Sequence, residues 1–478
     1  MADTTTTNLL LTKPEVGAST DTWGTKSNTN WDSVDSLFAA DGTGTSVGLN
    51  VGSGKKLKIV GDVIDTNGNE LLKVTATASA VNELTLANAA TGGAPTLTAS
   101  GGDTNIGMKL VGKGTGEVTA RVNGSDVFNA SSNFGFKNRI INGAMVIDQR
   151  NAGASVTITT DNTFTLDRWS TAATASSKFS VQQSTTAATG FINSLLATSL
   201  SAYSVGSGDI FAFKHTIEGL NVADLGWGTV NAQTITVSFW VRSSLTGTFG
   251  GALQNGAQNR SYPFSFTISA ANTFEYKTVT IAGDTSGTWL TNNGKGLLLW
   301  INLGTGSTGS GTAGAWAGAA YWAPTGATSV VGTNGATFYI TGVQLEKGST
   351  ATSFDYRPYG TELQLCQRYF EKLNFDTNAS YDFIMLAASN TTTTATAGLY
   401  WQVSKRATPT VSTSAANSFR LNITGGSDGT VTQINASNIS VINAAFSVVR
   451  SGQVVGNSAY VNREGVVSPC FISASAEL

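Results

Sequence analysis

The stretch GVQLEKGSTATSFDYRPYGTELQLCQRYFEKL, residues 342–373, separates two kinds of structure in this 478-residue chain. Its first part continues the apolar run ATFYITGVQLEKG, where alternation through Phe338 and Ile340 predicts a strand. Pro358 disfavours helical geometry at the residue before it, so the chain is expected to be extended at Arg357. We therefore interpret the stretch as the end of one β domain, a packed connector and the start of another.

The last part of the same stretch predicts a short helix that begins near Thr361. Thr361 and Gln364 have capping-box spacing, in which each side chain bonds a backbone N–H of the first turn. Leu363, Cys366 and Phe370 then recur at the spacing that places side chains on one helical face. This helix is expected to open the C-terminal domain.

Large side chains crowd the connector between that strand and that helix. Three aromatic rings within six residues need a surface to cover them, and we expect Tyr356 and Tyr359 to be buried between the two β domains, together with Phe354. Arg357 is expected to pair with a carboxylate or with backbone carbonyl groups. These four residues form the predicted interdomain contact.

The composition favours β structure with many turns and excludes several partners. Gly occurs 54 times and Pro 7 times, and only 12% of the residues are charged, with a formal net charge of −2. Such a chain offers little to a polyanion, so no nucleic acid partner is expected. No run reaches the length needed to span a membrane, and the N-terminus lacks the pattern of a signal peptide, so no membrane insertion and synthesis in a cytoplasm are expected.

An amphipathic helix is predicted within residues 1–42. Ser19 or Thr20 can cap it, and its apolar positions follow helical spacing. A single helix of this kind cannot cover its own tryptophans, so it needs copies of itself, another protein, or, as the alternative, its own chain. The apolar positions are Trp23, Trp31, Val34, Leu37 and Phe38.

The remaining chain divides into three predicted β segments. Residues 43–135 alternate short strand-like pieces with Gly- and Asn-rich turns, and each piece is too poor in apolar residues to form a sheet alone. Three copies wound round one axis would bury them, which predicts a slender shaft in a homotrimer. Residues 136–358 hold many strands without intervening helices, which indicates a sandwich or jelly roll, and residues 359–478 form a helix plus a C-terminal β domain.

Several motifs together carry a resemblance to a known class of proteins. KNRIINGAMVIDQRNAG (residues 137–153), FTLDRW (164–169), TVSFWVRSS (236–244) and the opening stretch resemble the receptor-binding region of tailed-bacteriophage tail fibres. That region is similar to jelly-roll carbohydrate-binding modules. The resemblance implies a homotrimer whose N-terminal segment attaches to a tail protein of the virion and whose distal domains bind a glycan or other receptor on the host cell surface.

Glycan binding needs an exposed ring for the apolar face of a sugar and polar groups for its hydroxyls. Residues 304–329 form a long loop of small residues that predicts uncovered aromatic rings. Two further tryptophans stand in turn-like contexts. The alternative is that these rings pack inward or against a neighbouring copy. The candidate ligand-binding residues are Trp316, Tyr321, Trp322, Trp289 and Trp227.

Catalytic chemistry has few candidates in this sequence. His215 is the single histidine, and its strand-like context with Phe211 and Phe213 on one face predicts a structural or interface role. A polysaccharide-cleaving tail spike would use paired carboxylates, but ion-paired structural roles explain the candidates better. The candidate carboxylates are Asp148, Asp167, Asp284, Glu346 and Asp355.

Two cysteines, Cys366 and Cys470, are expected to be buried free thiols, with contact between them left open. A calcium ion held by Asp and backbone oxygens is left open as well, but no dense acidic loop supports it, so no metal or cofactor is expected. The sequence thus predicts a non-enzymatic, trimeric tail fibre located in the virion tail. The alternatives are a depolymerase tail spike and another virion fibre, such as a capsid fibre.

Overall fold

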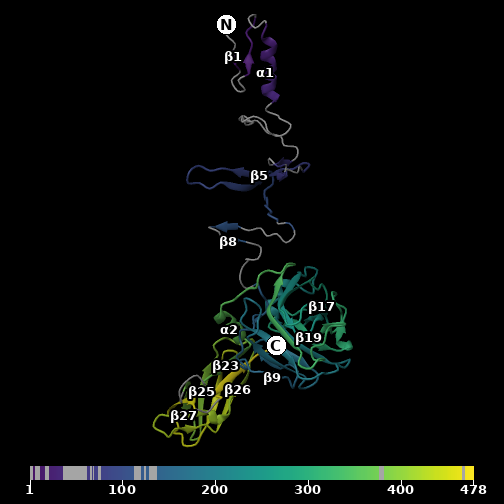
Figure 1. The fold of residues 1–478 in the computed structure, drawn as a ribbon. Coiled ribbons are helices and arrows are strands. Elements are labelled where there is room, and N and C mark those ends of the chain that lie inside the picture. Colours follow the sequence, from purple (N-terminus) through teal and green to yellow (C-terminus); the bar gives the residue numbers. More distant parts are fainter. Residues whose placement is uncertain are drawn as a thin grey trace. The chain divides into compact units, whose positions relative to one another are not determined.

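A computed structural model gives the fold of the protein (Figure 1). It describes residues 4–5, 11–16, 21–35, 62–64, 67, 69–73, 77–111, 113, 120–122, 125–128, 137–375, 382–465 and 469–478. The chain forms two compact units, Met1–Gly114 and Thr115–Leu478, which are described separately.

The first unit contains one helix and three hairpins among its described residues. Helix α1 (Trp23–Asp35) lies against β2, where the side chain of Asn30 bonds both the N–H and the carbonyl of Thr12 at 2.7 and 2.6 Å. Each hairpin is an antiparallel pair of short strands. The strands are β1 (Thr4–Thr5), β2 (Thr12–Lys13), β3 (Asp62–Ile64), β4 (Glu70–Lys73), β5 (Asn82–Ala87) and β6 (Thr96–Gly101).

The β5–β6 hairpin leaves its leucines in solvent within this chain. Leu84, Leu86 and Leu97 are exposed, and Leu86 pairs directly with Leu97 across the two strands. An isolated two-stranded hairpin is marginally stable at best in water. The hairpin therefore agrees with the prediction that strands in this region need another surface to cover them. The structure is of a single chain, so the trimer itself stays a prediction.

The second unit is built on a β-sandwich of two six-stranded sheets, each wholly antiparallel, as expected for residues 136–358. The first sheet has the order β10 (Phe164–Leu166), β11 (Trp169–Ala173), β14 (Ile210–Glu218), β19 (Lys295–Thr305), β16 (Gly247–Asn255) and β17 (Ser261–Ile268). The second has the order β18 (Glu275–Ile281), β15 (Ile235–Ser243), β22 (Thr337–Lys347), β13 (Ser194–Ser199), β12 (Phe179–Ser184) and β9 (Val156–Thr157). This unit also holds the short pairs β7 (Ala120–Val122) with β8 (Ser125–Phe128) and β20 (Ser310–Gly311) with β21 (Ala323–Pro324).

Period-two alternation decides which side chains fill the sandwich. On β15, Val237, Phe239 and Val241 are fully buried in the main core, whereas Trp240 and Arg242 between them are only half-buried. Successive side chains of a strand point to opposite faces, so the second pair lies on the outer face of the sheet. The runs ITVSFWVRSS, FEYKTVTIAG, GLLLWINLG and ATFYITGVQLE have the β-branched and apolar pattern that predicts strands, and they are confirmed as β15, β18, β19 and β22.

The helix after the connector forms, but its predicted boundaries are wrong. Helix α2 (Tyr359–Gln367) begins after Pro358, and no side chain caps it, so Thr361 lies inside the helix rather than at a capping box. Pro358 occupies the N-cap position in an extended conformation, with φ −53° and ψ 141°, and the helix follows directly after it. Phe370 is not on the helix, because it opens strand β23.

The C-terminal domain contains a three-stranded and a seven-stranded sheet around its own core (Figure 1). The smaller sheet has the order β23 (Phe370–Asn374), β32 (Phe471–Ser475) and β26 (Thr410–Thr413). The larger has the order β28 (Gly429–Thr430), β27 (Phe419–Ile423), β31 (Ser458–Arg463), β24 (Phe383–Ser389), β25 (Thr394–Tyr400), β30 (Asn443–Val449) and β29 (Gln433–Ser437).

The low complexity of TTTTATA, residues 391–397, predicts a loop, and this prediction is wrong for its second half. Thr394 begins β25, in which Ala395 and Ala397 are buried and Thr396 between them is exposed. Alternation of Ala with β-branched Thr suits a half-buried strand. This low-complexity sequence therefore has the two-residue period of a strand. The expectation for the cysteines is confirmed, because Cys366 and Cys470 are both buried and free.

Buried charged groups join the sandwich to the C-terminal domain. The Glu218 carboxylate accepts hydrogen bonds from Arg368 at 2.6 Å and from the Tyr369 hydroxyl at 2.6 Å, and Glu477 pairs with Arg150 at 2.8 Å and with Arg168. Burying charge is costly unless each charge is paired, and these contacts pair them. The junction is therefore polar, with a small apolar cluster beside it that consists of Ile141, Ile147, Cys366, Tyr369 and Leu478.

Candidate functional site

The outer face of the second sheet carries an open groove. Trp240 of β15 lies directly opposite Tyr276 of β18, with ring centroids 5.3 Å apart and ring planes at 47°. Tyr276 is 43% exposed. A β-bulge in the pairing of β15 with β22 lies between Ser238 and Trp240, and bulges turn side chains out of the regular pleat. These two rings form one wall of the groove.

A loop between β12 and β13 lays a third ring over the middle of the sheet. Phe191 lies against strand β22 at Gly342, where an added Cβ would stand 2.5 Å from the Phe191 Cζ. Gly342 also has a φ of +60°, a conformation that glycine adopts at little cost. Glycine at this position therefore lets the loop approach the strand closely enough for the ring to lie on the sheet.

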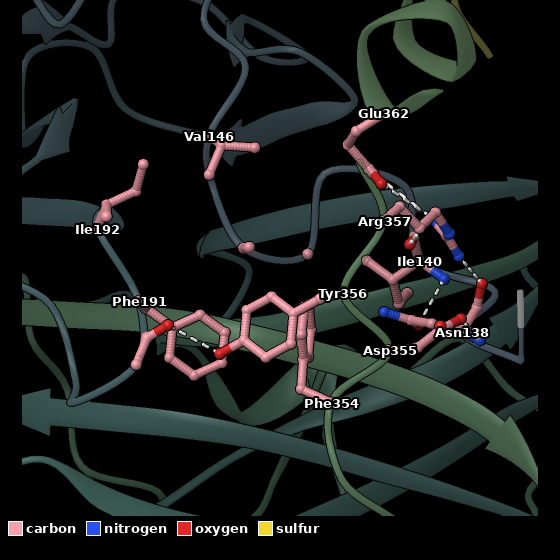
Figure 2. A pocket seen from close by; sticks show the side chains of 13 residues that line it. Asn138, Ile140, Val146, Phe191, Ile192, Phe354, Asp355, Tyr356, Arg357 and Glu362 are labelled. Atoms are coloured by element: carbon pink, nitrogen blue, oxygen red, sulfur yellow. Dashed lines mark hydrogen bonds and ion pairs between the residues drawn. The ribbon is translucent and has the colours of Figure 1, made fainter. Parts of the chain in front are cut away.

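The connector supplies the opposite wall. Phe354 and Tyr356 contact Phe191 with centroid distances of 5.1 and 5.5 Å, and the Tyr356 hydroxyl donates a hydrogen bond of 2.8 Å to the Gly190 carbonyl (Figure 2). The hollow measures about 480 Å³. Its lining residues are Thr189, Phe191, Ser238, Trp240, Tyr276, Gly342, Ala351, Thr352, Ser353, Phe354 and Tyr356.

Hydroxyl groups stand among these rings. The Thr352 hydroxyl donates a hydrogen bond of 2.6 Å to Glu346, which fixes its position, and its oxygen keeps lone pairs that accept further bonds. Thr189 and Ser353 are exposed and add hydroxyl-bearing side chains to the lining, whereas Ser238 is nearly fully buried. A groove with aromatic faces and scattered hydroxyls can bind a ligand that is itself part apolar and part hydroxylated.

Three of the predicted binding tryptophans meet, but as a packed cluster away from this groove. Trp227, Trp289 and Trp316 lie 4.7 to 5.5 Å apart, edge to face, and each indole N–H donates to a backbone carbonyl. Trp227 is 7% exposed, so the expectation that its ring is uncovered is wrong. Trp289 and Trp316 are half-buried against the main core. Edge-to-face packing of indoles stabilises the cluster and covers the rings that small neighbours were expected to leave open.

Of the other two predicted residues, only Trp322 packs against a separate small apolar cluster. Trp322 is half-buried and packs against Trp300 of β19 at 6.4 Å, and Tyr321 is half-buried beside Gly311. The carbonyl of Tyr321 accepts a hydrogen bond of 2.7 Å from Gln254. Residues 304–329 thus fold back over the first sheet, which explains why a loop without apolar alternation still packs.

The predicted burial of the connector tyrosines is wrong. Tyr356 is 59% exposed and Tyr359 is 63% exposed, and Phe354 is half-buried. The polar junction described above joins the domains, so these rings are not needed there, and Tyr356 packs on the sandwich instead. The prediction for Arg357 is confirmed, because it pairs with Glu362 at 3.2 Å and donates to the Ile140 carbonyl at 3.2 Å.

The predicted attachment helix exposes its tryptophans within this chain. Trp23 is 61% exposed, Trp31 is 68% exposed and Val34 is half-buried. Leu37 and Phe38 lie outside the described residues. The two exposed indoles on α1 are the surface for which the sequence predicts a partner.

His215 has a structural place, as expected. It is fully buried beside Trp169, with ring centroids 5.0 Å apart, and its Nε2 lies 2.9 Å from the Ile141 carbonyl oxygen. Burial, with help from the nearby Arg168 guanidinium, lowers the pKa of His215 to about 3. A neutral, enclosed imidazole of this kind is a packing residue.

The candidate carboxylates are held by structural contacts: Asp284 has the expected ion pair, and the other four accept hydrogen bonds. Asp167 accepts both of its bonds from Gln149 at 2.7 Å, and burial raises its pKa to about 7. Asp355 accepts from the Asn138 N–H at 3.2 Å, and Asp284 pairs with Arg260. Asp148 accepts hydrogen bonds from the backbone N–H groups of Asn151 and Gly153. Glu346 accepts hydrogen bonds from the backbone N–H and the hydroxyl of Thr352.

Metal and membrane features can be stated for the described part of the chain. Within it, no group of three or more His, Cys, Asp or Glu side chains is placed to hold a metal ion. No helix in the same part is long and apolar enough to cross a membrane.

The groove was missed from sequence, but one signal in the chain indicates it. In ITVSFWVRS, residues 235–243, the apolar residues of the core alternate with Trp240, so a tryptophan is placed on the opposite, outer face. Tyr276 likewise occupies an outward-facing position in the alternating pattern of β18. No local pattern places Phe191 beside them, because it comes from a loop that crosses the sheet.

Comparisons with known proteins give structural similarity only. No known protein family matches the sequence, and no curated protein matches it. A tailspike protein domain of bacteriophage CBA120 is similar at 12% identity and a TM-score of 0.24, covering 38% of this chain and 19% of the tailspike chain. A family 22 carbohydrate binding module of Clostridium thermocellum matches at 14% identity and a TM-score of 0.21, covering 38% of this chain and 89% of the module. A family 11 carbohydrate-binding module from the same organism matches at 9% identity and a TM-score of 0.21, covering 42% of this chain and 98% of the module.

Proposed function

We propose that the protein binds a glycan in the groove on the outer face of the second sheet. The observation that carries this proposal is the convergence of Trp240, Tyr276, Phe191 and Tyr356 around one open hollow of about 480 Å³ that also contains hydroxyl groups. A sugar ring has an apolar C–H face and a rim of hydroxyls. The exposed aromatic rings suit the face, and the Thr and Ser hydroxyls suit the rim.

The size of the groove favours a short part of a chain over a lone small molecule. It is open on the sheet face, and its walls come from strand, loop and connector. A polymer can pass through such a hollow while a few rings contact the aromatic side chains. Modest affinity at each site suffices when several copies bind one surface, since the second binding event becomes intramolecular.

We propose further that the chain is a tail fibre of a bacteriophage, which uses this site to attach the virion to the host cell without catalysis. The sequence resemblance supports this, and so do two exposed apolar surfaces. Trp23 and Trp31 of α1 suit attachment to a virion tail protein, and the leucines of the β5–β6 hairpin suit burial among three copies. The virion tail is then the location of the protein.

A binding screen with a matched variant tests the glycan site. The full chain and its Tyr276→Ala variant are applied to an array of bacterial surface glycans, together with Tyr460→Ala as a control. Tyr276 and Tyr460 are exposed to a similar extent, 43% and 40%, but Tyr460 lies in the C-terminal domain. We expect wild type and Tyr460→Ala to bind the same glycans, and Tyr276→Ala to lose most of the signal. Equal signals from all three proteins would exclude the groove.

The fibre role and the absence of catalysis need separate measurements. Removing residues 1–42 is expected to leave a folded protein that no longer joins virions. Incubation with the glycan found on the array is expected to release no reducing ends, whereas release would identify the protein as a depolymerase tail spike. Labelling of virions with an antibody distinguishes a tail fibre from a capsid fibre.

A further inference from the structure

A second, more enclosed hollow adjoins the groove. It measures about 250 Å³ and shares the rings of Phe191, Phe354 and Tyr356 with the groove, so these rings form a common wall. Figure 2 shows Val146 and Ile192 on the far side of the hollow from these rings. The full lining is Asn138, Ile140, Gly143, Ala144, Val146, Gly190, Phe191, Ile192, Phe354, Asp355, Tyr356, Arg357 and Glu362.

Most polar groups of this second hollow are engaged with the protein itself. Arg357 forms an ion pair with Glu362 and donates hydrogen bonds to the carbonyls of Ile140 and Asn138. The Asn138 side-chain amide donates a hydrogen bond of 3.0 Å to the Val343 carbonyl. The Asp355 carboxylate accepts from the Asn138 N–H. A ligand hydroxyl placed here would compete with these bonds or remain unsatisfied, and an unsatisfied buried polar group is costly.

The rest of the lining is mainly carbon surface. Ala144, Val146 and Ile192 contribute methyl groups, and Phe191 contributes its ring. The hollow of about 250 Å³ has room for a small acyl group, because one water molecule takes up about 30 Å³ in the liquid. The hollow therefore suits a small apolar group and disfavours a hydroxyl.

We propose that this hollow binds a methyl-bearing substituent of the glycan that occupies the adjoining groove. The proposal rests on the proposed glycan-binding function. The substituent can be an N-acetyl group, an O-acetyl group or the methyl of a 6-deoxy sugar, because all three present a methyl where an ordinary sugar has a hydroxyl. The protein then selects acetylated or deoxy glycans over their plain counterparts.

Pairs of probes that differ in the substituent test this selection. The N-acetyl pair is β-1,4-linked N-acetylglucosamine trimer against β-1,4-linked glucose trimer. The deoxy pair is L-fucose against L-galactose, and the O-acetyl pair is an acetylated xylan against the same xylan after alkaline deacetylation. Titration of the full chain by calorimetry or NMR gives the affinities. We expect a preference of about tenfold or more for the methyl-bearing member of at least one pair.

Two variants locate the preference in the hollow. Ala144→Leu fills the space and is expected to remove the preference, while Ile192→Ser replaces a rim side chain that is 71% exposed and is expected to reduce it without affecting the fold. Thermal melting of each variant checks folding. Trp240→Ala, in the groove alone, is expected to weaken both members of a pair equally.

The outcomes separate the two proposals. Equal affinities within every pair, all lowered by Trp240→Ala, would leave glycan binding in place and overturn the inference about the substituent. A preference that persists in both Ala144→Leu and Ile192→Ser would overturn it too. Binding that Trp240→Ala does not change would overturn the groove itself.

Discussion

The ring of Phe191 lies on the backbone of Gly342, at a point where a single added carbon would stand 2.5 Å from its Cζ atom. This contact brings a loop of the sandwich onto strand β22 and sets one wall of the groove. The contact depends on glycine for two reasons, the close approach and a φ of +60°.

Gly342→Ala is therefore expected to lower stability and to displace Phe191. The left-handed backbone alone costs a non-glycine residue about 1–2 kcal/mol, and the clash adds to this. Gly335→Ala is the matched control, because Gly335 has a φ of +73° and no atom within 4 Å of an added Cβ. Urea unfolding of both variants measures the difference, and equal losses would show that the Phe191 contact is unimportant.

Arg357 and Glu362 form a buried ion pair next to the second hollow, with side chains 6% and 10% exposed. Arg357→Ala leaves the Glu362 carboxylate buried without this partner, which is expected to cost about 3 kcal/mol. The double variant Arg357→Met with Glu362→Gln removes both charges and is expected to recover part of the loss. A double variant that is as unstable as the sum of Arg357→Met and Glu362→Gln, each made alone, would show that the two residues are not coupled.

Trp316 is expected to be a stability residue. Its ring contacts Trp227, Trp289 and Tyr262, and its indole N–H donates 2.8 Å to the Ala282 carbonyl. Trp316→Ala is therefore expected to cost about 3 kcal/mol, measured by chemical unfolding, and to leave glycan affinity unchanged. A stable variant with weakened binding would return the site to residues 304–329.

His215 is expected to make stability fall at acid pH. Its pKa is about 3 in the folded protein against an ordinary value of 6.5, so the unfolded chain takes up a proton first as the pH falls. The stabilisation is fully present above pH 6.5 and is lost as the pH falls towards 3. The difference in unfolding free energy between wild type and His215→Gln should change by about 1.4 kcal/mol per pH unit in this window.

Asp167 has the opposite effect on how stability depends on pH. It is present both in wild type and in His215→Gln. Its pKa is raised from 3.8 to about 7 by burial, so its contribution to stability is lost as the pH rises between these values. Subtracting the two unfolding curves therefore isolates His215. A difference that does not vary between pH 3 and 6.5 would contradict the assignment.

The homotrimer remains a prediction, and it has a direct measurement. Sedimentation equilibrium of the full chain should give three times the 49.4 kDa mass of one chain. Replacing Leu84, Leu86 and Leu97 of the β5–β6 hairpin with Ser is expected to weaken the assembly, since these side chains are exposed in the single chain. A monomer at micromolar concentration would exclude both the trimer and the role of the hairpin.

The sequence by itself determined the features that depend on local patterns. Alternation of apolar residues predicted β15, β18, β19 and β22, because period two decides which side chains enter the core of a sandwich. The position of His215 on one strand face with Phe211 and Phe213 predicted a structural or interface role, and the structure shows a buried, structural imidazole. The proline at position 358 predicted the break between strand and helix.

Only the tertiary structure decided which aromatic rings meet. Small neighbours in residues 304–329 predicted uncovered rings, but Trp227 and Trp289, distant in the chain, fold onto Trp316 and cover part of it. The groove instead gathers Trp240, Tyr276, Phe191 and Tyr356 from two strands, a loop and the connector. Sheet pairing and loop crossing are contacts between residues far apart in sequence, so no local pattern carries them, and exposure of a ring depends on them.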